Sequence, residues 1–214
     1  MKCLAVNTAT KILSVALLDD DRVLHLYQTA ETRDQGNLLL RHIRAGLDKN
    51  GLTFDDLDLL AVTTGPGSFT GIRIGLAAVR GIALAANKPV TGVSSFDMFA
   101  VPGVNNLVAV ESWRDEPYFR LVGADGRVLI SPVNEMPEVF AARLPDMSLT
   151  VSGDAAEKIM PILPPGTILH KPEANAVRVA QVAVNSWNPE EFPIRPTPFY
   201  LRPADITLPR ASNP

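Results

Sequence analysis

The chain has 214 residues and a formal net charge of −3, with 46% hydrophobic and 20% charged residues. This is the composition of a globular protein with a sizeable core, and the negative balance excludes a basic, stand-alone nucleic-acid binder. The single cysteine, Cys3, excludes an intrachain disulfide and fits a reducing compartment. The opening MKCLAVNTAT is too short and too polar for a signal or membrane segment, so we expect a cytoplasmic protein.

The first half predicts three strands followed by alternating helices and strands. The stretches CLAV, ILSVALLD and RVLHLYQT alternate or run apolar as strands do, and an acidic turn joins the last two in a hairpin. Leucine or isoleucine then recurs every fourth position, as on the buried face of a helix. In order, the expected elements are strands within 3–28, a helix at 37–50, a strand at 57–64, a helix at 70–87, a strand in VTGVSS and a short helix.

The second half partly repeats this order after a break at Pro102-Gly103. Strands are expected in NLVAVES, in the hairpin PYFRLVGADGRVLIS and in SLTVSG, and helices in MPEVFAARL, DAAEKIMPIL and ANAVRVAQVAVNSW. We therefore predict an α/β fold of two related lobes, residues 1–102 and a smaller 103–214 that ends in a proline-rich tail.

The segment TTGPGSFTGIRIG, residues 63–75, allows two interpretations. Glycines between a strand and a helix let backbone N–H groups approach a phosphate, and a helix N-terminus favours an anion. The glycine spacing, however, fits neither the P-loop nor the dinucleotide fingerprint. The alternative, which the residues alone favour, is a tight turn that needs glycine dihedral angles. A nucleophile elbow fails, because Pro66 stands where G-x-S-x-G requires glycine.

The helix that follows is dense in small residues. Gly71 and Gly75 lie one turn apart, and Ala78 and Ile82 continue the same face. A glycine costs about 1 kcal/mol inside a helix relative to alanine, so these positions indicate a close approach of another backbone. That backbone belongs either to the helix's own sheet or to a partner helix, and the sequence favours the two alternatives equally. Two arginines in the segment argue against a membrane helix.

Metal binding has little support in the sequence. His42 has Gly46 and Leu38 one turn away on its helix, so no second ligand shares its face. The acidic run at 19–21 is explained better by a solvated hairpin turn than by a cation site.

Five segments resemble a known family. They are LAVNTAT, SVALLDD, GPGSFTGIRIGLAAVRGIAL, PVTGVSSFD and the later PFYLRP. The chain is similar to the bacterial TsaB family, formerly called YeaZ, most clearly over residues 1–100. The resemblance implies the two-lobed actin/Hsp70/sugar-kinase fold, abbreviated ASKHA. It also implies a role in making threonylcarbamoyladenosine next to the anticodon of tRNA, as a non-catalytic scaffold subunit.

The resemblance further implies partners. The catalytic relative TsaD carries a metal-binding H-x-x-x-H, which this sequence lacks, and TsaE, an ATPase, joins the pair. A homodimer is expected in isolation, tRNA is reached only through the complex, and no membrane is involved. The first strand of the family ends in Asp-Thr, whereas this chain has Asn7-Thr8, which weakens any autonomous ATP hydrolysis.

In the family, the first two helices form the seam with TsaD or with a second copy. The implied interface residues are Leu38, Leu39, His42, Gly71, Arg73, Ile74, Gly75, Ala78 and Ile82. No cofactor is expected on the chain alone; ATP or ADP is the candidate at the shared interface. The residues expected to contact that nucleotide are Thr8, Gly65, Gly67, Ser68 and Thr70. The alternative functions are a stand-alone ATPase or kinase of the same superfamily and an M22-like metallopeptidase.

Overall fold

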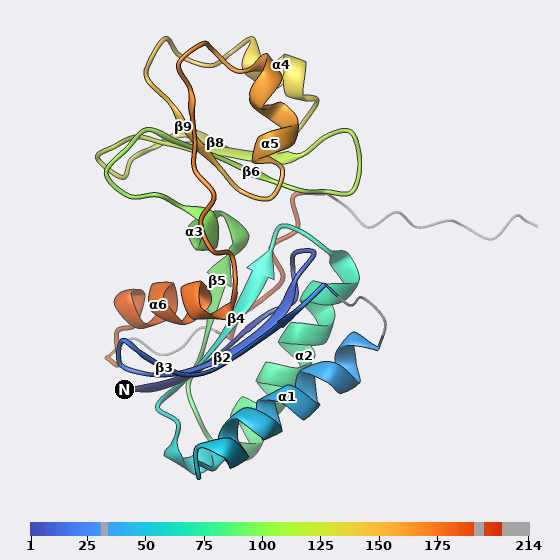
Figure 1. Ribbon diagram of the computed structural model, residues 1–214, viewed down its shortest axis with the longest axis vertical. Coiled ribbons are helices and arrows are strands. Elements are labelled where there is room, and N and C mark those ends of the chain that lie inside the picture. Colours follow the sequence, from blue (N-terminus) through green and yellow to red (C-terminus); the bar gives the residue numbers. More distant parts are fainter. Residues whose placement is uncertain (31–33, 191–194, 203–214) are drawn as a thin grey trace, which may run out of the picture.

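The computed structural model describes residues 1–30, 34–190 and 195–202, which form two lobes, each built on a five-stranded sheet (Figure 1). The first lobe contains β1 (Lys2–Asn7), β2 (Leu13–Asp19), β3 (Arg22–Thr29), α1 (Gln35–Lys49), the short η1 (Phe54–Asp56), β4 (Leu59–Gly65), α2 (Phe69–Ala86), β5 (Val90–Ser94) and α3 (Ser95–Phe99). The remaining elements are β6 (Asn106–Val110), β7 (Tyr118–Val122), β8 (Val128–Asn134), α4 (Pro137–Ala141), β9 (Thr150–Ser152), α5 (Ala156–Ile159), η2 (Met160–Ile162), β10 (Ile168–Leu169) and α6 (Ala176–Ser186).

The two sheets repeat one topology. The strand order is β3-β2-β1-β4-β5 in the first lobe and β8-β7-β6-β9-β10 in the second. In each sheet the first strand pairs antiparallel with the second and parallel with the fourth, β1 with β2 and β4, and β6 with β7 and β9. The predicted duplicated α/β fold is therefore confirmed.

The first sheet is covered on both faces, by α1 and α2 on one side and by α6 on the other (Figure 1). Alternate residues of β1 enter the two cores, as the two-residue period of a strand requires: Leu4 and Val6 face α1 and α2, while Cys3 and Ala5 face α6. Although α6 follows the second lobe in sequence, it packs on β1, β2, β4 and β5 of the first.

The glycines of α2 face the helix's own lobe. A Cβ atom built on Gly71 would lie 1.9 Å from the Thr8 carbonyl oxygen, and one on Gly75 would lie 2.3 Å from Thr8 Oγ1. The expectation that these two glycines admit a partner helix is therefore wrong, because they allow α2 to approach the end of β1. Leu39 is likewise fully buried in the first lobe, so its assignment to an interface is also wrong.

A buried carboxyl group lies in the second lobe where it faces the first. Asp154 Oδ1 accepts a 2.8 Å hydrogen bond from the Glu111 backbone N–H, and the Lys11 ammonium lies 3.9 Å from the Glu111 carboxylate. Lys11 follows β1, so this ion pair connects the two lobes. Burial raises the pKa of the Asp154 carboxyl to about 6.

We predict that alanine destabilises the folded protein at two glycines of α2 and stabilises it at a third. Gly71→Ala and Gly75→Ala should each lower the free energy of unfolding by about 1–3 kcal/mol, because the added methyl group overpacks the contact with Thr8. Gly81→Ala, where a Cβ meets nothing within 4 Å, should raise it by about 0.5–1 kcal/mol. Urea unfolding curves measure all three; equal effects at the three positions would contradict the inward orientation.

We also predict a pH-dependent difference between wild type and Asp154→Asn. The folded-state pKa of about 6 lies above the unfolded value of about 3.9, so the folded protein takes up the proton first. The stability of the wild type relative to the variant should therefore rise as the pH falls from about 6 to about 4. Burial lowers the pKa of His25 and His42, which destabilises both proteins alike below about pH 6.5, so the difference isolates Asp154. Parallel stability–pH curves would refute the assignment.

Candidate functional site

The loop between β4 and α2 is a tight turn shaped by glycine. Gly65 and Gly67 have φ values of 104° and 151°, and a Cβ on Gly67 would lie 2.1 Å from the Ala9 carbonyl oxygen. Ser68 donates its backbone N–H to the same oxygen at 2.7 Å. Its hydroxyl accepts from the Gly71 N–H at 3.1 Å and so caps α2. The segment is therefore a tight turn whose close contacts with Ala9 require glycine at position 67.

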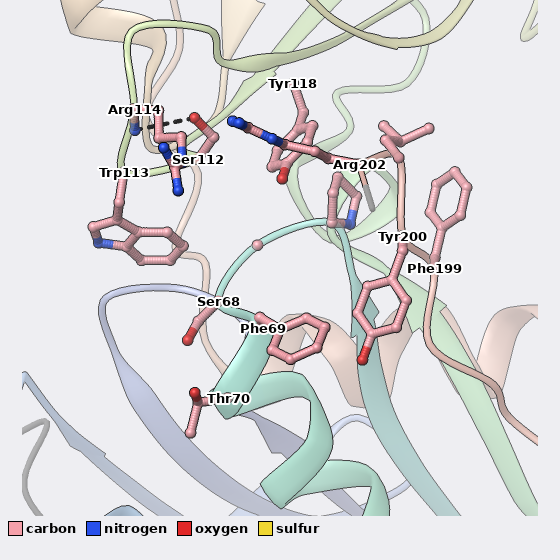
Figure 2. Close-up of a pocket in the computed structure, with 13 residues that line it drawn as sticks. Ser68, Phe69, Thr70, Ser112, Trp113, Arg114, Tyr118, Phe199, Tyr200 and Arg202 are labelled. Atoms are coloured by element: carbon pink, nitrogen blue, oxygen red, sulfur yellow. Dashed lines mark hydrogen bonds between the residues drawn. The ribbon is translucent and has the colours of Figure 1, made fainter. Parts of the chain in front are cut away.

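This loop forms the floor of a pocket between the lobes, with a volume of about 480 Å³ (Figure 2). Four separate segments line it: the β4–α2 loop with the start of α2, the loop after β6, the start of β7 and the chain near residue 200. The lining residues are Pro66, Gly67, Ser68, Phe69, Thr70, Ser112, Trp113, Arg114, Tyr118, Phe199, Tyr200, Leu201 and Arg202.

The loop after β6 is held by its own side chains. Glu111 Oε1 accepts the backbone N–H groups of Ser112 and Trp113 at 3.1 and 3.0 Å, and Ser112 Oγ accepts that of Arg114 at 3.2 Å. Trp113 adopts φ 59°, a region that bulky residues rarely occupy, and the residue is 46% exposed. The hydrogen bonds thus hold the backbone of the loop that carries Trp113 into the lining of the pocket.

The chain near residue 200 closes another wall. Phe199 donates its N–H to the Thr64 carbonyl at 2.8 Å, which places the segment beside β4. The Tyr200 ring lies 5.1 Å from the Phe69 ring, and its hydroxyl accepts a 3.1 Å hydrogen bond from Arg73 Nε. The Arg73 guanidinium lies 3.7 Å above the Phe69 ring. This wall is therefore attached to the first turn of α2.

Among the lining residues that the structure describes, the pocket contains no His, Cys, Asp or Glu, the groups that most often transfer protons near neutral pH. Its polar groups are hydroxyls, two guanidinium groups and the N-terminal N–H groups of α2. Elsewhere among the residues the structure describes, no three His, Cys, Asp or Glu side chains come together as metal ligands.

The pocket brings together part of the predicted nucleotide set. Gly67, Ser68 and Thr70 line it, whereas Thr8 is fully buried under α2 and Gly65 is buried against Ile72. Sequence reasoning missed the residues that reach the pocket from distant segments, namely Trp113, Arg114, Tyr118, Tyr200 and Arg202. Most of these residues lie in the runs ESWR and PFYLRP, but nothing in either run shows that the fold brings the two runs together.

The second candidate site is the outer face of α1 and α2, opposite the side that meets the sheet. Leu84 and Leu40 are 79% and 51% exposed there. Ala77, Gly81 and Ala85 follow one another every four residues on the exposed side of α2. This small-residue row, rather than Gly71 and Gly75, faces outward.

The other predicted interface residues border this face. Half-buried Ile74, Ala78 and Ile82 pack against the core beneath, and Leu38 is half-buried on α1. Arg73 is exposed but hydrogen-bonded to Tyr200. His42 stacks on Tyr27 with the ring centroids 3.2 Å apart, and burial lowers its pKa.

The helix α2 is also the one helix in the described ranges with the length and apolar composition to cross a membrane, and about a third of it is buried. Helices that pack on a sheet of a soluble protein share these properties. Its inner side packs on β4 and α1, so the fold accounts for the buried part.

Known proteins resemble the chain in sequence and structure. The family model described as TsaD, tRNA N6-adenosine threonylcarbamoyltransferase, matches residues 31–121. The tRNA threonylcarbamoyladenosine biosynthesis protein TsaB of Escherichia coli is 39% identical over 95 residues, which cover 44% of this chain and 41% of that protein. An uncharacterized protein of Mycobacterium bovis is 31% identical over 209 residues, covering 94% of this chain and 92% of its own.

Among solved structures, YeaZ from Pseudomonas aeruginosa superposes with a TM-score of 0.79 at 26% identity, covering 94% of this chain and 99% of its own. The matched region spans only about half or less of the curated TsaB relatives, 41% of the Escherichia coli protein and 52% of the Haemophilus influenzae one. The duplicated sheets have the ASKHA fold. With full-length matches to a bacterial relative and to YeaZ, the chain belongs to the TsaB (YeaZ) family.

Proposed function

We propose that the chain serves in the biosynthesis of tRNA threonylcarbamoyladenosine as a non-catalytic subunit that pairs with a TsaD-like transferase. Relatives bear the name of that pathway, and the family model of the transferase matches residues 31–121. The observation that carries the proposal is the exposed apolar surface on the outer side of α1 and α2, where Leu84 is 79% exposed beside the exposed small residues of α2.

The small-residue row suits helix–helix docking. Side chains no larger than a methyl group at Ala77, Gly81 and Ala85 let a second helix come close. Exposed Leu84 on α2 and Leu40 on α1 supply apolar area. A stable interface buries about 800 Å² of accessible surface on each partner. Each square ångström of apolar surface removed from water contributes about 25 cal/mol of favourable free energy. A helix pair of this length can provide that contact.

We propose that the partner that covers the outer face of α1 and α2 is a relative of the chain itself. The matched residues 31–121 include both α1 and α2, so a TsaD-like transferase carries an equivalent helix pair. Two related faces can pack about a pseudo-twofold axis, as identical faces do in a homodimer. We propose that the chain pairs with itself when alone and with the transferase when that is present.

The side chain at the end of β1 supports a non-catalytic role. Buried Asn7 uses its Oδ1 to accept the Ala9 N–H and the Thr63 hydroxyl, both at 3.1 Å, and its Nδ2 donates to Thr10 Oγ1 at 2.9 Å. This amide is fully used in holding the turn after β1, and it carries no charge for a metal-bound phosphate. We further propose that a TsaE-like ATPase joins the pair and that the chain reaches tRNA only through the complex. We propose a cytoplasmic location for the complex.

The first test is Leu84→Asp. It should fold normally, because the side chain is exposed, yet weaken association with the TsaD-like transferase at least tenfold, since an aspartate would lose its hydration at the seam. Analytical ultracentrifugation of mixtures measures the association. Val139→Asp, at a 57% exposed valine on α4, is the matched control and should pair normally. Undiminished pairing of Leu84→Asp would reject this face.

The second test reconstitutes the pathway from purified components. We expect threonylcarbamoyl transfer to tRNA to fall by an order of magnitude or more without the chain, to return when it is added, and to stay low with Leu84→Asp. The chain alone should show no ATP turnover above background. Normal transfer in its absence would refute the subunit role, and robust ATP turnover by the pure chain would instead favour the autonomous ATPase.

A further inference from the structure

We infer that a second cavity between the lobes binds an aliphatic diamine, with one ammonium group at Asp154, the other at Glu173 and the hydrocarbon chain against apolar walls. The inference goes beyond the proposed function, because this cavity shares no lining residue with the pocket at the start of α2 and lies away from the outer face of α1 and α2. Its volume of about 400 Å³ lies in the range of small-molecule sites.

Both lobes and the chain that joins them line the second cavity. Gln28 comes from β3 of the first lobe, and Asp154 comes from the turn after β9 of the second. Residues 169–175 belong to the chain that runs from β10 in the second lobe down to α6 on the first (Figure 1). Apolar side chains supply much of the lining: Ile12, Phe99, Leu169, Pro172 and Ala174.

The turn after β9 holds Asp154 in one position. Gly153 has a φ of 109°, and a Cβ atom there would lie 1.9 Å from the Ala109 carbonyl oxygen of β6, so the turn can lie this close only with glycine. The same carbonyl accepts the Ala155 N–H at 3.2 Å, and Asp154 Oδ1 accepts the Glu111 N–H at 2.8 Å. The backbone and one carboxylate oxygen are therefore held before any ligand binds.

The other oxygen of this carboxylate has no partner. Asp154 Oδ2 is buried and accepts no hydrogen bond from the residues that the structure describes. The positive charge of Lys11 acts on Asp154, but its ammonium pairs with Glu111 at 3.9 Å and Lys11 does not line the cavity. A buried acceptor without a hydrogen bond costs free energy, so a positively charged donor is favoured beside it.

The lining carries more negative than positive charge. It contains Asp154, Glu157 and Glu173 against Lys171, and Lys171 is paired with Glu157. Two carboxylates, those of Asp154 and Glu173, are thus left without a cation from the lining. Glu157 and Lys171 are both exposed, so their side chains can move aside and let an ammonium group approach Asp154 Oδ2.

Two further oxygens of the lining are only weakly satisfied. Gln28 Oε1 and Glu173 Oε2 share the Asn175 amide as donor, each at 3.4 Å, which is long for a hydrogen bond. An ammonium group donates three hydrogen bonds and supplies the charge that the lining lacks. A metal ion fits less well, because no three His, Cys, Asp or Glu side chains of the described residues come together as ligands. Two separate carboxylates with apolar side chains around them match a diamine.

Isothermal titration calorimetry of the full chain with putrescine, n-butylamine and magnesium chloride tests the inference. We expect saturable binding of putrescine with a Kd below about 1 mM. The affinity for n-butylamine should be about fivefold lower, because it has no second ammonium for Glu173. Magnesium carries the same charge as putrescine but has neither N–H donors nor a hydrocarbon chain, so it should bind about tenfold more weakly or not at all.

Variants assign the binding to this cavity. Asp154→Asn keeps an oxygen for the Glu111 N–H but removes the charge, so it should fold and weaken putrescine about tenfold. Glu173→Gln should weaken it about threefold, and Lys171→Ala should tighten it about threefold, because Glu157 then loses its own cation. Asp48→Asn, at an exposed aspartate on α1, is the charge-matched control and should leave binding unchanged. Circular dichroism confirms that each variant is folded.

The pH dependence of binding gives an independent readout. The pKa of Asp154 of about 6 means that its carboxyl loses its charge as the pH falls from about 7.5 to about 5, so putrescine affinity should fall about tenfold over this range. Asp154→Asn should lack this change. Glu111, Lys11 and the other charged groups of the lining are the same in both proteins, so the difference isolates Asp154.

Any one of four outcomes would overturn the inference. They are no saturable binding of putrescine, magnesium binding as tight as that of putrescine, n-butylamine binding as tight as that of putrescine, and an affinity that Asp154→Asn leaves unchanged. The pairing experiments with Leu84→Asp use another surface of the protein, so their result and the result of these titrations are independent of each other.

Discussion

The contact between α2 and the turn after β1 determines where everything else in the molecule lies. Gly67, Gly71 and Gly75 bring the helix against Thr8 and Ala9 at distances that no Cβ atom would allow. This close approach fixes the direction of α2, so its first turn opens at the boundary between the lobes and its outer side faces solvent. The pocket and the exposed outer face of α1 and α2 are two consequences of one packing constraint.

The sequence predicted the elements, their order and the duplication well, because hydrophobic period and turn residues are local signals. It left open which way the glycines of α2 face. Residues spaced by one helical turn reveal a common face, but only the packed partner, here Thr8, shows whether that face points inward. The same limit explains why Leu39 was wrongly assigned to an interface. Its place on an amphipathic helix fits either a core or an interface, and only the sheet beneath shows that it is buried in the core.

The pocket was harder still to foresee. Its floor follows from a glycine motif, but Trp113 and Arg202 come from segments far apart in sequence. They meet because the second lobe stacks above the first and the chain returns along β4 after α6. The wall of the pocket near residue 200 is also linked to α2, because Tyr200 contacts Phe69 and Arg73 on the helix whose outer side is exposed.

The position of α6 has a consequence for how the protein is made. One face of the first sheet is covered by a helix that ends at Ser186, so Ala5 and Ala61 have no cover until nearly the whole chain has left the ribosome. A nascent first lobe would present this bare apolar surface during synthesis, a state prone to aggregation. The elements β6 to β10 of the second lobe are contiguous in the chain, but Val108, Val110 and Tyr118 share a core cluster with α3 and α6, so we expect the burial of both sheets to be completed only once α6 is available.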